Sequence, residues 1–403
     1  MRVVLLLPSS SYRATAFVAA AKALGAEVVV ASDQVSPALD PAGTRAIELP
    51  FDDPDRAAVM LADLDGRGPV DAVVAVDDVG VVLAARTSEL LGLPHNPPDA
   101  AARTRDKRAL RRALDAGEVP QPRWAEVVDR DDLPDVGFPC VVKPASLSGS
   151  QGVIRADDPE AARAAAQRAH DIGCGVPLLV EEFVPGAEVA VEGIVRAGAL
   201  TVLAVFDKPD PLDGPYFEET IYVTPSRLPA ATLAQVTRVA GDAAAAIGLT
   251  DGPVHAELRV DQDPAGDRAR VRVIDVAARS IGGLCARALR FGAGISLEEV
   301  ILRHALGLPL DDVRRESSAS GVMMLPIPNT GTLRAVHGQD DARDVPGVVG
   351  LEISINPGRP VVALPEGDRY LGFLFARGDT AEEVEATLRA AHARLEVVIE
   401  PAP

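Results

Sequence analysis

Two carboxylates lie on alternating apolar and polar stretches that a short turn separates. Glu257 belongs to VHAELRV and Asp275 to VRVIDVA, and the turn DPAGD at 263–267 lies between them. This pattern predicts a β-hairpin. If Gly266 is near its centre, the two acids lie directly opposite on one face, with Cβ atoms roughly 4.5–5.5 Å apart. Carboxylates this close repel unless a cation separates them, and Mg²⁺ favours one or two carboxylates plus substrate phosphates.

Arg279 follows Asp275 at an even spacing, so a strand extending that far would place it on the same face. A guanidinium there could hold an oxyanion or a substrate carboxylate through two hydrogen bonds. A solvated hairpin with scattered charge is the alternative that this segment alone leaves open.

A lysine at a predicted strand end precedes a loop of small residues in FPCVVKPASLSGSQGV. Small side chains let backbone N–H groups approach phosphate oxygens, and Lys143 adds a positive charge at the base of the loop. No GxxxxGK[ST] sequence occurs, so this is not a Walker A loop. Taken alone, such a segment is more often an ordinary turn. The candidate phosphate contacts in the loop are Ser146, Ser148, Gly149, Ser150 and Gly152.

A predicted strand at 178–183 meets a turn at Pro185-Gly186, and Glu188 follows. Backbone groups at a hinge between lobes can read an adenine edge, and a carboxylate can accept hydrogen bonds from a ribose diol. In isolation, an ordinary strand, turn and strand with exposed acids is the favoured interpretation of the segment.

Three regions must position these groups. Residues 1–97 alternate apolar runs with alanine-rich helices, which predicts a parallel, doubly wound α/β domain without a GxGxxG fingerprint. A Pro-rich stretch, GLPHNPPDA, marks the boundary, and a basic helix follows. Residues 98–310 carry short strands and Gly-rich turns, and residues 311–403 form a last α+β portion.

Composition excludes several classes of partner. The 59 acidic residues outnumber the 40 basic ones, giving a net charge of −19 over 403 residues, which disfavours nucleic acid and anionic membranes. Aromatic residues make up 3% of the chain, too few for base-stacking platforms. No apolar stretch approaches the roughly 18 residues of a membrane span. We expect a cytoplasmic protein.

Together, in this order, the segments resemble the ATP-grasp superfamily over roughly residues 1–310. The resemblance implies an N-terminal Rossmann-like domain, a two-lobed ATP-grasp fold and a C-terminal α+β portion. It also implies binding of ATP and Mg²⁺, with lysines, a hinge, acids and an arginine at matching positions. These positions are Lys107 and Lys143 for the phosphates, Glu181, Glu182, Phe183 and Val184 for adenine, Glu188 for ribose, Glu257 and Asp275 for the metal, and Arg279 for an oxyanion.

Further segments are similar to the L-amino-acid ligases, namely HAEL, ARSIGG and YLGFLFARGDTAEEVEATL. The resemblance implies small-molecule carboxylate and amine substrates joined through an acyl phosphate, with Lys143 and Arg279 as catalytic residues, and suggests a homodimer. Lys208 is a further candidate for the phosphates or the acceptor, and Glu218 and Glu219 are candidate substrate contacts.

The chain departs from the family at the second metal strand, where Asp275-Val276-Ala277 replaces Glu-x-Asn. Asp reaches about 1.5 Å less far than Glu, one carbon–carbon bond, and Ala277 offers no ligand. One Mg²⁺ site is therefore expected, and the second is in question. Two alternatives remain: a biotin carboxylase-like enzyme that phosphorylates bicarbonate, and a degenerate nucleotide-binding protein.

Overall fold

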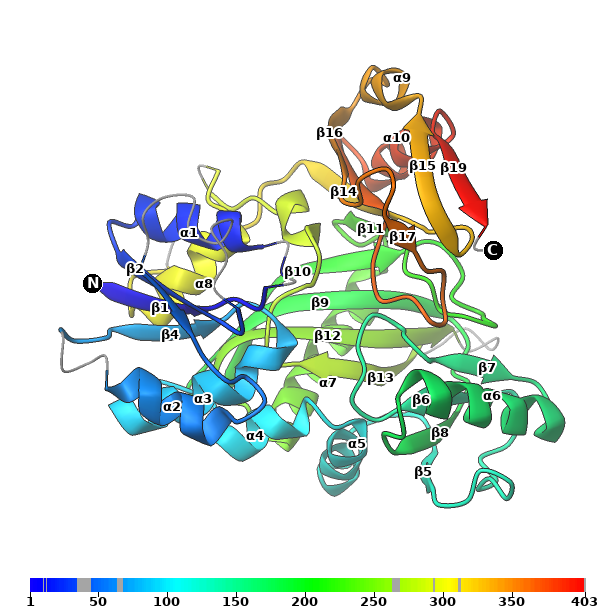
Figure 1. The fold of residues 1–403 in the computed structure, drawn as a ribbon, viewed down its shortest axis with the longest axis horizontal. Helices are drawn as coiled ribbons and strands as arrows, with labels where there is room; N and C mark the ends of the chain where they lie inside the picture. Colours follow the sequence, from blue (N-terminus) through cyan, green and yellow to red (C-terminus); the bar gives the residue numbers. More distant parts are fainter. Residues whose placement is uncertain are drawn as a thin grey trace.

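The fold is that of a computed structural model, shown in Figure 1. The structure describes residues 1–9, 11, 13–34, 45–63, 68–262, 269–292, 294–310 and 313–401. The predicted turn at 263–267, with Gly266, lies outside the described residues, and so do residues 311–312 at the start of the predicted C-terminal region.

The N-terminal region is a parallel sheet with helices on both faces. Odd-numbered residues of the first strand, such as Leu5, share a core with Phe17, whereas even-numbered ones, such as Leu6, share a core with Leu61 and Leu83. Burial on both faces explains the continuous apolar run and confirms the predicted doubly wound domain. The strand order is β3-β2-β1-β4. The elements are β1 (Arg2–Leu6), α1 (Ala14–Ala23), β2 (Glu27–Ser32), β3 (Arg45–Glu48), α2 (Pro54–Ala62), β4 (Ala72–Ala75), η3 (Asp78–Gly80) and α3 (Val81–Leu91).

A small antiparallel sheet with one helix forms the lid, defined here as residues 124–182. Its strand order is β5-β8-β6-β7. The alanine stripe of its helix packs on the sheet and, because methyl groups are small, lets helix and sheet approach closely. Two short helices precede the lid. The elements are α4 (Pro98–Arg103), α5 (Lys107–Ala116), β5 (Trp124–Val127), β6 (Cys140–Pro144), β7 (Ile154–Ala156), α6 (Pro159–Ile172) and β8 (Leu178–Glu182).

A larger sheet forms the centre of the molecule, with order β13-β12-β9-β10-β11-β14-β18-β16. Helix α7 covers one face, where its residues share a core with Val189 and Val191 of β9. The elements up to residue 310 are β9 (Ala187–Arg196), β10 (Ala199–Lys208), β11 (Ile221–Thr224), α7 (Ala230–Ile247), β12 (Asp251–Gln262), β13 (Ala269–Ala277), η4 (Cys285–Ala288) and α8 (Leu297–Ala305).

The C-terminal region extends this sheet with β14, β18 and β16 and adds a small sheet of order β17-β15-β19. The connection between β17 and β18 descends towards the lid (Figure 1). Among the described residues, no helix has the length and apolar character that a membrane span requires. The elements are β14 (Ala319–Leu325), β15 (Gly331–His337), α9 (Gln339–Arg343), β16 (Val348–Ile353), β17 (Pro360–Val361), β18 (Gly372–Gly378), α10 (Ala381–His392) and β19 (Glu396–Pro401).

Candidate active site

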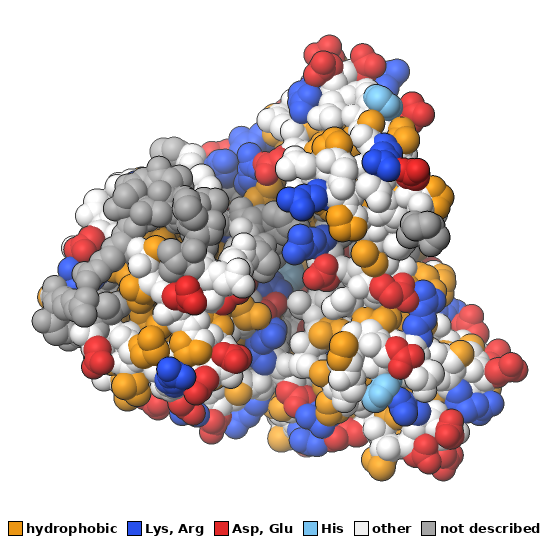
Figure 2. Space-filling view, in the orientation of Figure 1, with side chains coloured by type: hydrophobic (Ala, Val, Ile, Leu, Met, Phe, Trp, Pro, Cys, Tyr) orange, Lys and Arg blue, Asp and Glu red, His pale blue; other side chains and the backbone are white. Residues whose placement is uncertain are grey.

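A cavity of about 680 Å³ lies where these regions meet. Its wall includes loops at the carboxyl ends of β1, β2 and β4, the lid loop 146–151, one face of β12 and β13, and residues 368–370. Figure 2 shows this face hollowed between the N-terminal region, the lid and the C-terminal region, with Lys and Arg side chains around the hollow. The volume suits a small-molecule site.

The register of the central sheet places a grid of polar side chains beneath this cavity. Strand β9 lies between β12 and β10, and every second residue of each strand faces the same way. One row holds Arg259, Glu188 and Lys208; the next holds Asp275, Glu257, Ala190 and Phe206; the third holds Ala277, His255, Glu192 and Ala204.

Lys208 forms ion pairs with three acidic side chains at this site. Its Nζ lies 2.7 Å from Glu188, 2.6 Å from Glu219 and 2.8 Å from Glu257. An ammonium has three donors, so each can go to one carboxylate. Burial lowers the pKa of Lys208, but the three acids outweigh burial and raise it well above its usual value. Lys208 therefore stays charged and balances the acidic cluster.

His255 is a member of the grid that the sequence reasoning did not assign. Its Nδ1 contacts Glu192 on β9, and its Nε2 lies 3.4 Å from Glu257. Burial lowers the pKa of His255, but Glu192 and Glu257 raise it to about 9, so the imidazolium donates to both acids at neutral pH. The signal was its even spacing from Glu257 on a predicted strand, which places both residues on one face.

Glu257 and Asp275 are opposite in the register, and a bulge at Ile274 separates this pair from the ladder nearer the turn. Their carboxylates pair with different lysine side chains. Glu257 binds Lys208, whereas Asp275 lies 3.4 Å from Lys107 and accepts a 3.0 Å hydrogen bond from the Val276 N–H. Strand β13 ends at Ala277, two residues before Arg279.

Lys143 is buried at the end of β6, and its Nζ lies 2.7 Å from Glu181 on the neighbouring strand β8. Glu181 also accepts hydrogen bonds of 2.7 and 2.9 Å from Arg111, which donates further to the carbonyl groups of Val273 and Ile274. Burial lowers the pKa of Lys143 to about 8, although Glu181 opposes this. Burial raises the pKa of Glu181, but Arg111 and Lys143 outweigh it and bring the pKa to about 2.

Lys107 stands at the first position of α5 and connects that helix to the lid loop. Its N–H donates to the Ala145 carbonyl at 2.8 Å, and its Nζ donates to the Leu147 carbonyl at 2.9 Å. The loop requires left-handed backbone at Gly149 and Gly152, with φ of 63° and 70°. The Gly152 N–H donates to the Pro365 carbonyl at 2.9 Å, so the C-terminal connection holds the loop. Ser146, Ser148 and Ser150 line the cavity, whereas Gly152 is absent from its wall.

The predicted hinge also lines the cavity, through Glu181, Glu182, Phe183 and Val184. The Glu182 side chain binds Arg123 and Arg272, each at 2.6 Å, and the Phe183 ring lies 4.4 Å from the guanidinium of Arg155. Glu188 uses one oxygen for Lys208 and the other for Arg259, at 2.7 and 2.9 Å.

Arg279 is tied to the N-terminal domain. Its Nη2 donates to Asp78 at 2.9 Å, and its Nη1 donates to the Ser280 carbonyl at 3.0 Å. Arg13 of the N-terminal domain donates a 2.6 Å hydrogen bond to the hydroxyl group of the next residue, Ser280. The segment after β13 is therefore fastened to the N-terminal domain, which places Arg279 in the cavity wall.

Comparisons with protein families match three successive parts of the chain. The ATP-grasp N-terminal domain matches residues 18–95, the ATP-grasp domain matches residues 136–288, and the L-amino acid ligase C-terminal domain 2 matches residues 323–400.

Similar proteins are diverse in activity. Alanine–anticapsin ligase of Bacillus subtilis is 24% identical over 59% of this chain and 54% of its own length, so the chain spans about half of that relative. An L-amino acid ligase from Bacillus licheniformis has a TM-score of 0.83 at 24% identity, covering 99% of this chain and 98% of that one. Biotin carboxylase from Campylobacter jejuni has a TM-score of 0.68 at 16% identity, covering 99% and 92%.

The solved structures show the shared fold, and the family matches follow one another in the order of the regions described above. The mixed α/β class and the similarity to L-amino acid ligases expected from the sequence are both confirmed. The chain belongs to the ATP-grasp superfamily and carries the C-terminal domain of the L-amino acid ligases.

Proposed function

We propose that this protein is an ATP-dependent carboxylate–amine ligase that forms an amide or peptide-like bond and releases ADP and phosphate. The observation that carries the proposal is the convergence on one cavity of two lysines, a loop of small residues, an acidic pair and Arg279. These groups can hold a polyphosphate, its metal and an oxyanion.

In this proposal, Lys107 and Lys143 offset phosphate charge beneath the loop 146–152. Adenine lies against the hinge 181–184 and uses main-chain atoms of Glu182 and Val184. Glu188 accepts the ribose hydroxyl groups through lone pairs that Lys208 and Arg259 leave free, because a carboxylate has about four acceptor positions. The phosphates would compete with the three acids for Lys208.

The residues present fit Mg²⁺. Glu257 and Asp275 are opposite each other in the register and both line the cavity. The oxygens of Glu188, Glu219 and Glu257 that lie within 4.8 Å of one another surround the ammonium of Lys208 instead. Carboxylate oxygens are the ligands that Mg²⁺ prefers. We assign Glu257 and Asp275 as its protein ligands, with one site rather than two because Ala277 has no ligand atom. When bound, the metal would neutralise charge on the phosphates.

The chemistry follows from what a carboxylate lacks. A carboxylate is a poor electrophile, so the substrate carboxylate first attacks the γ-phosphorus of ATP, giving an acyl phosphate and ADP. The amine then attacks the acyl carbon, phosphate leaves, and the amine loses a proton. Arg279 would stabilise the tetrahedral oxyanion, as a fixed donor directed at developing charge. The lid loop would exclude water that hydrolyses the acyl phosphate.

The biotin carboxylase-like alternative shares the fold, so fold similarity does not separate the two reactions. The L-amino acid ligase C-terminal domain at residues 323–400 favours the ligase. The division at residues 97 and 310, the homodimer and the cytoplasmic location stay predictions.

The test is release of ADP from ATP and Mg²⁺ with amino acids supplied singly and in pairs, with product identified by mass. Stimulation by an acid–amine pair, with the conjugate formed, would support the proposal. Release driven by bicarbonate alone would support the carboxylase, and bound ATP without turnover would support a degenerate protein.

A further inference from the structure

Five of the arginines that the structure describes line the cavity, and their hydrogen bonding divides them into two groups. Arg13, Arg259 and Arg279 donate to carbonyl groups or side chains that fix them in place. Within the described part of the chain, Arg105 and Arg369 have an acidic neighbour but no side-chain hydrogen bond: Arg105 lies 3.7 Å from Asp78, and Arg369 lies 3.8 Å from Asp368. These two guanidinium groups have donors to offer a ligand.

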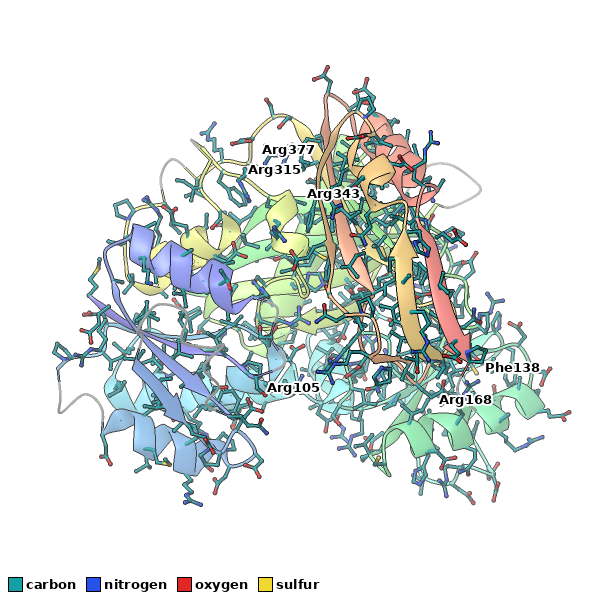
Figure 3. The ribbon with its side chains drawn as sticks, turned by 45° about the horizontal axis from the view of Figure 1, so that its top comes forward. Arg105, Phe138, Arg168, Arg315, Arg343 and Arg377 are labelled. Atoms are coloured by element: carbon teal, nitrogen blue, oxygen red, sulfur yellow. The ribbon has the colours of Figure 1, made fainter. Side chains whose placement is uncertain are left out.

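Arg105 is the better placed of the two for recognising a charged group. Its side chain is 28% exposed, against 60% for Arg369. A charge pair shielded from water is stronger than one in open solvent, where pairs contribute little. Figure 3 shows Arg105 between the N-terminal region and the lid, and along the chain it lies two residues before the start of α5.

Arg105 and Lys107 point to different parts of the cavity although one residue separates them. The Lys107 ammonium contacts Leu147 of the lid loop and Asp275 of β13, which is the phosphate end. The Arg105 guanidinium lies by Asp78, the residue that holds Arg279. Arg105 and Arg279 therefore lie on the same carboxylate in the cavity wall, whereas the Lys107 ammonium donates to the lid loop.

We infer that Arg105 binds the free carboxylate of the amine-donating substrate. This inference rests on the proposed ligase function. The other substrate's carboxylate is consumed in the reaction, so only the amine substrate has a carboxylate that needs a lasting partner. A guanidinium with unused donors can bind it through two parallel hydrogen bonds, which a neutral carboxamide cannot match. Arg105 thus selects amino acids over simple amines as acceptors.

The experiment compares each acceptor amino acid with its own carboxamide, beginning with L-alanine and L-alaninamide, against a panel of donor acids. The amide keeps the amine and loses the negative charge. We expect Arg105→Gln to lower kcat/KM for the amino acid by about 10- to 100-fold, the scale of lost hydrogen bonds to a charged group. The value for the amide and the KM for ATP should change less than about threefold.

Comparing variants cancels the intrinsic difference in reactivity between the two amines. Arg105→Lys keeps the charge but not the paired donors, so it should retain part of the preference for the amino acid over its amide. It replaces Arg105→Gln in the test if that variant does not fold. Arg369→Gln is the matched control and should keep the preference intact.

Three results would overturn the inference: an unchanged preference in folded Arg105→Gln, a rise confined to the KM for ATP, or loss of the preference in Arg369→Gln instead. If the wild-type protein ligates no pair at all, the proposed function itself fails.

Discussion

Replacing Lys143 by methionine separates the chemistry of the site from its structural support. Methionine keeps the apolar stem and removes the ammonium. Glu181 then loses one of its two cations but keeps Arg111, which donates to both of its oxygens at 2.7 and 2.9 Å. Because no uncompensated buried charge remains, we expect a loss of unfolding free energy below about 3 kcal/mol, the scale of a hydrogen bond to a charged group.

The loss of activity should be far larger. Lys143 is one of two lysines assigned to the phosphates, and removing a fixed donor from developing charge typically costs about 10²- to 10³-fold in rate. We therefore expect kcat/KM for ATP to fall by at least about 100-fold in Lys143→Met, measured by ADP release with the best substrate pair.

Arg111→Met is the matched control. It leaves the Lys143–Glu181 pair in place, but the carbonyl groups of Val273 and Ile274, inside the protein, lose the hydrogen bonds that Arg111 donates. Breaking such a buried network costs about 3–5 kcal/mol, so this variant should lose stability first. Urea unfolding measures the loss of unfolding free energy in each of the two variants. A folded Lys143→Met protein within tenfold of wild-type activity would refute the assignment, and so would equal destabilisation by the two variants.

Further predictions follow from the same contacts. Because the pKa of Lys143 is lowered from 10.5 to about 8, its ammonium is lost as pH rises through about 8, and kcat/KM for ATP should fall there; a profile flat to pH 10 would contradict this. Glu257→Gln should raise the Mg²⁺ concentration for half-maximal ADP release by at least about tenfold, whereas Glu352→Gln, outside the cavity, should leave this titration unchanged. Gly149→Ala and Gly152→Ala both strain a left-handed position, but only the second places a Cβ 2.8 Å from the Pro144 ring, next to Lys143. Gly152→Ala should therefore lower both the unfolding temperature and the rate of ADP release more than Gly149→Ala does. Equal effects of the two substitutions would argue against this coupling between the loop and Lys143.

Periodicity predicted much of the fold and the contents of one sheet face. The alternation in residues 253–277 predicted that Glu257 and Asp275 share one face, because side chains on a strand repeat every two residues. Taking Gly266 as the centre of the turn predicted that they lie opposite each other, as they do. The apolar runs of β1 and β2 likewise predicted a sheet buried on both faces. What the pattern did not give was the bulge at Ile274, since nothing in the sequence marks an inserted residue there.

Contacts between distant segments were beyond the sequence. The helix containing Lys107 is strongly basic and typical of a solvated face, yet Arg111 is fully buried because Glu181, 70 residues away, is its partner. The same holds for Arg13 and Ser280, which fasten the N-terminal domain to the segment that carries Arg279. Such pairs depend on how domains dock, which local spacing does not encode.

The C-terminal region was predicted as a separate α+β portion, but three of its strands extend the central sheet. Strand β14 pairs with β11, which puts Met323 opposite Ile221. Strand pairing over about a hundred residues is chosen by complementary apolar faces in the assembled core rather than by local propensity. The resulting connection reaches the lid, where Pro365 accepts the Gly152 N–H.

The central claim is that the cavity activates a carboxylate for attack by an amine. The most direct test supplies carboxyl-¹⁸O-labelled amino acid with ATP, Mg²⁺ and an acceptor amine, with bicarbonate in a separate reaction, and follows the label. An acyl phosphate intermediate predicts one ¹⁸O in the released phosphate for each conjugate formed. Conjugate without label in phosphate, or ADP release that responds to bicarbonate and not to any amine, would contradict the account.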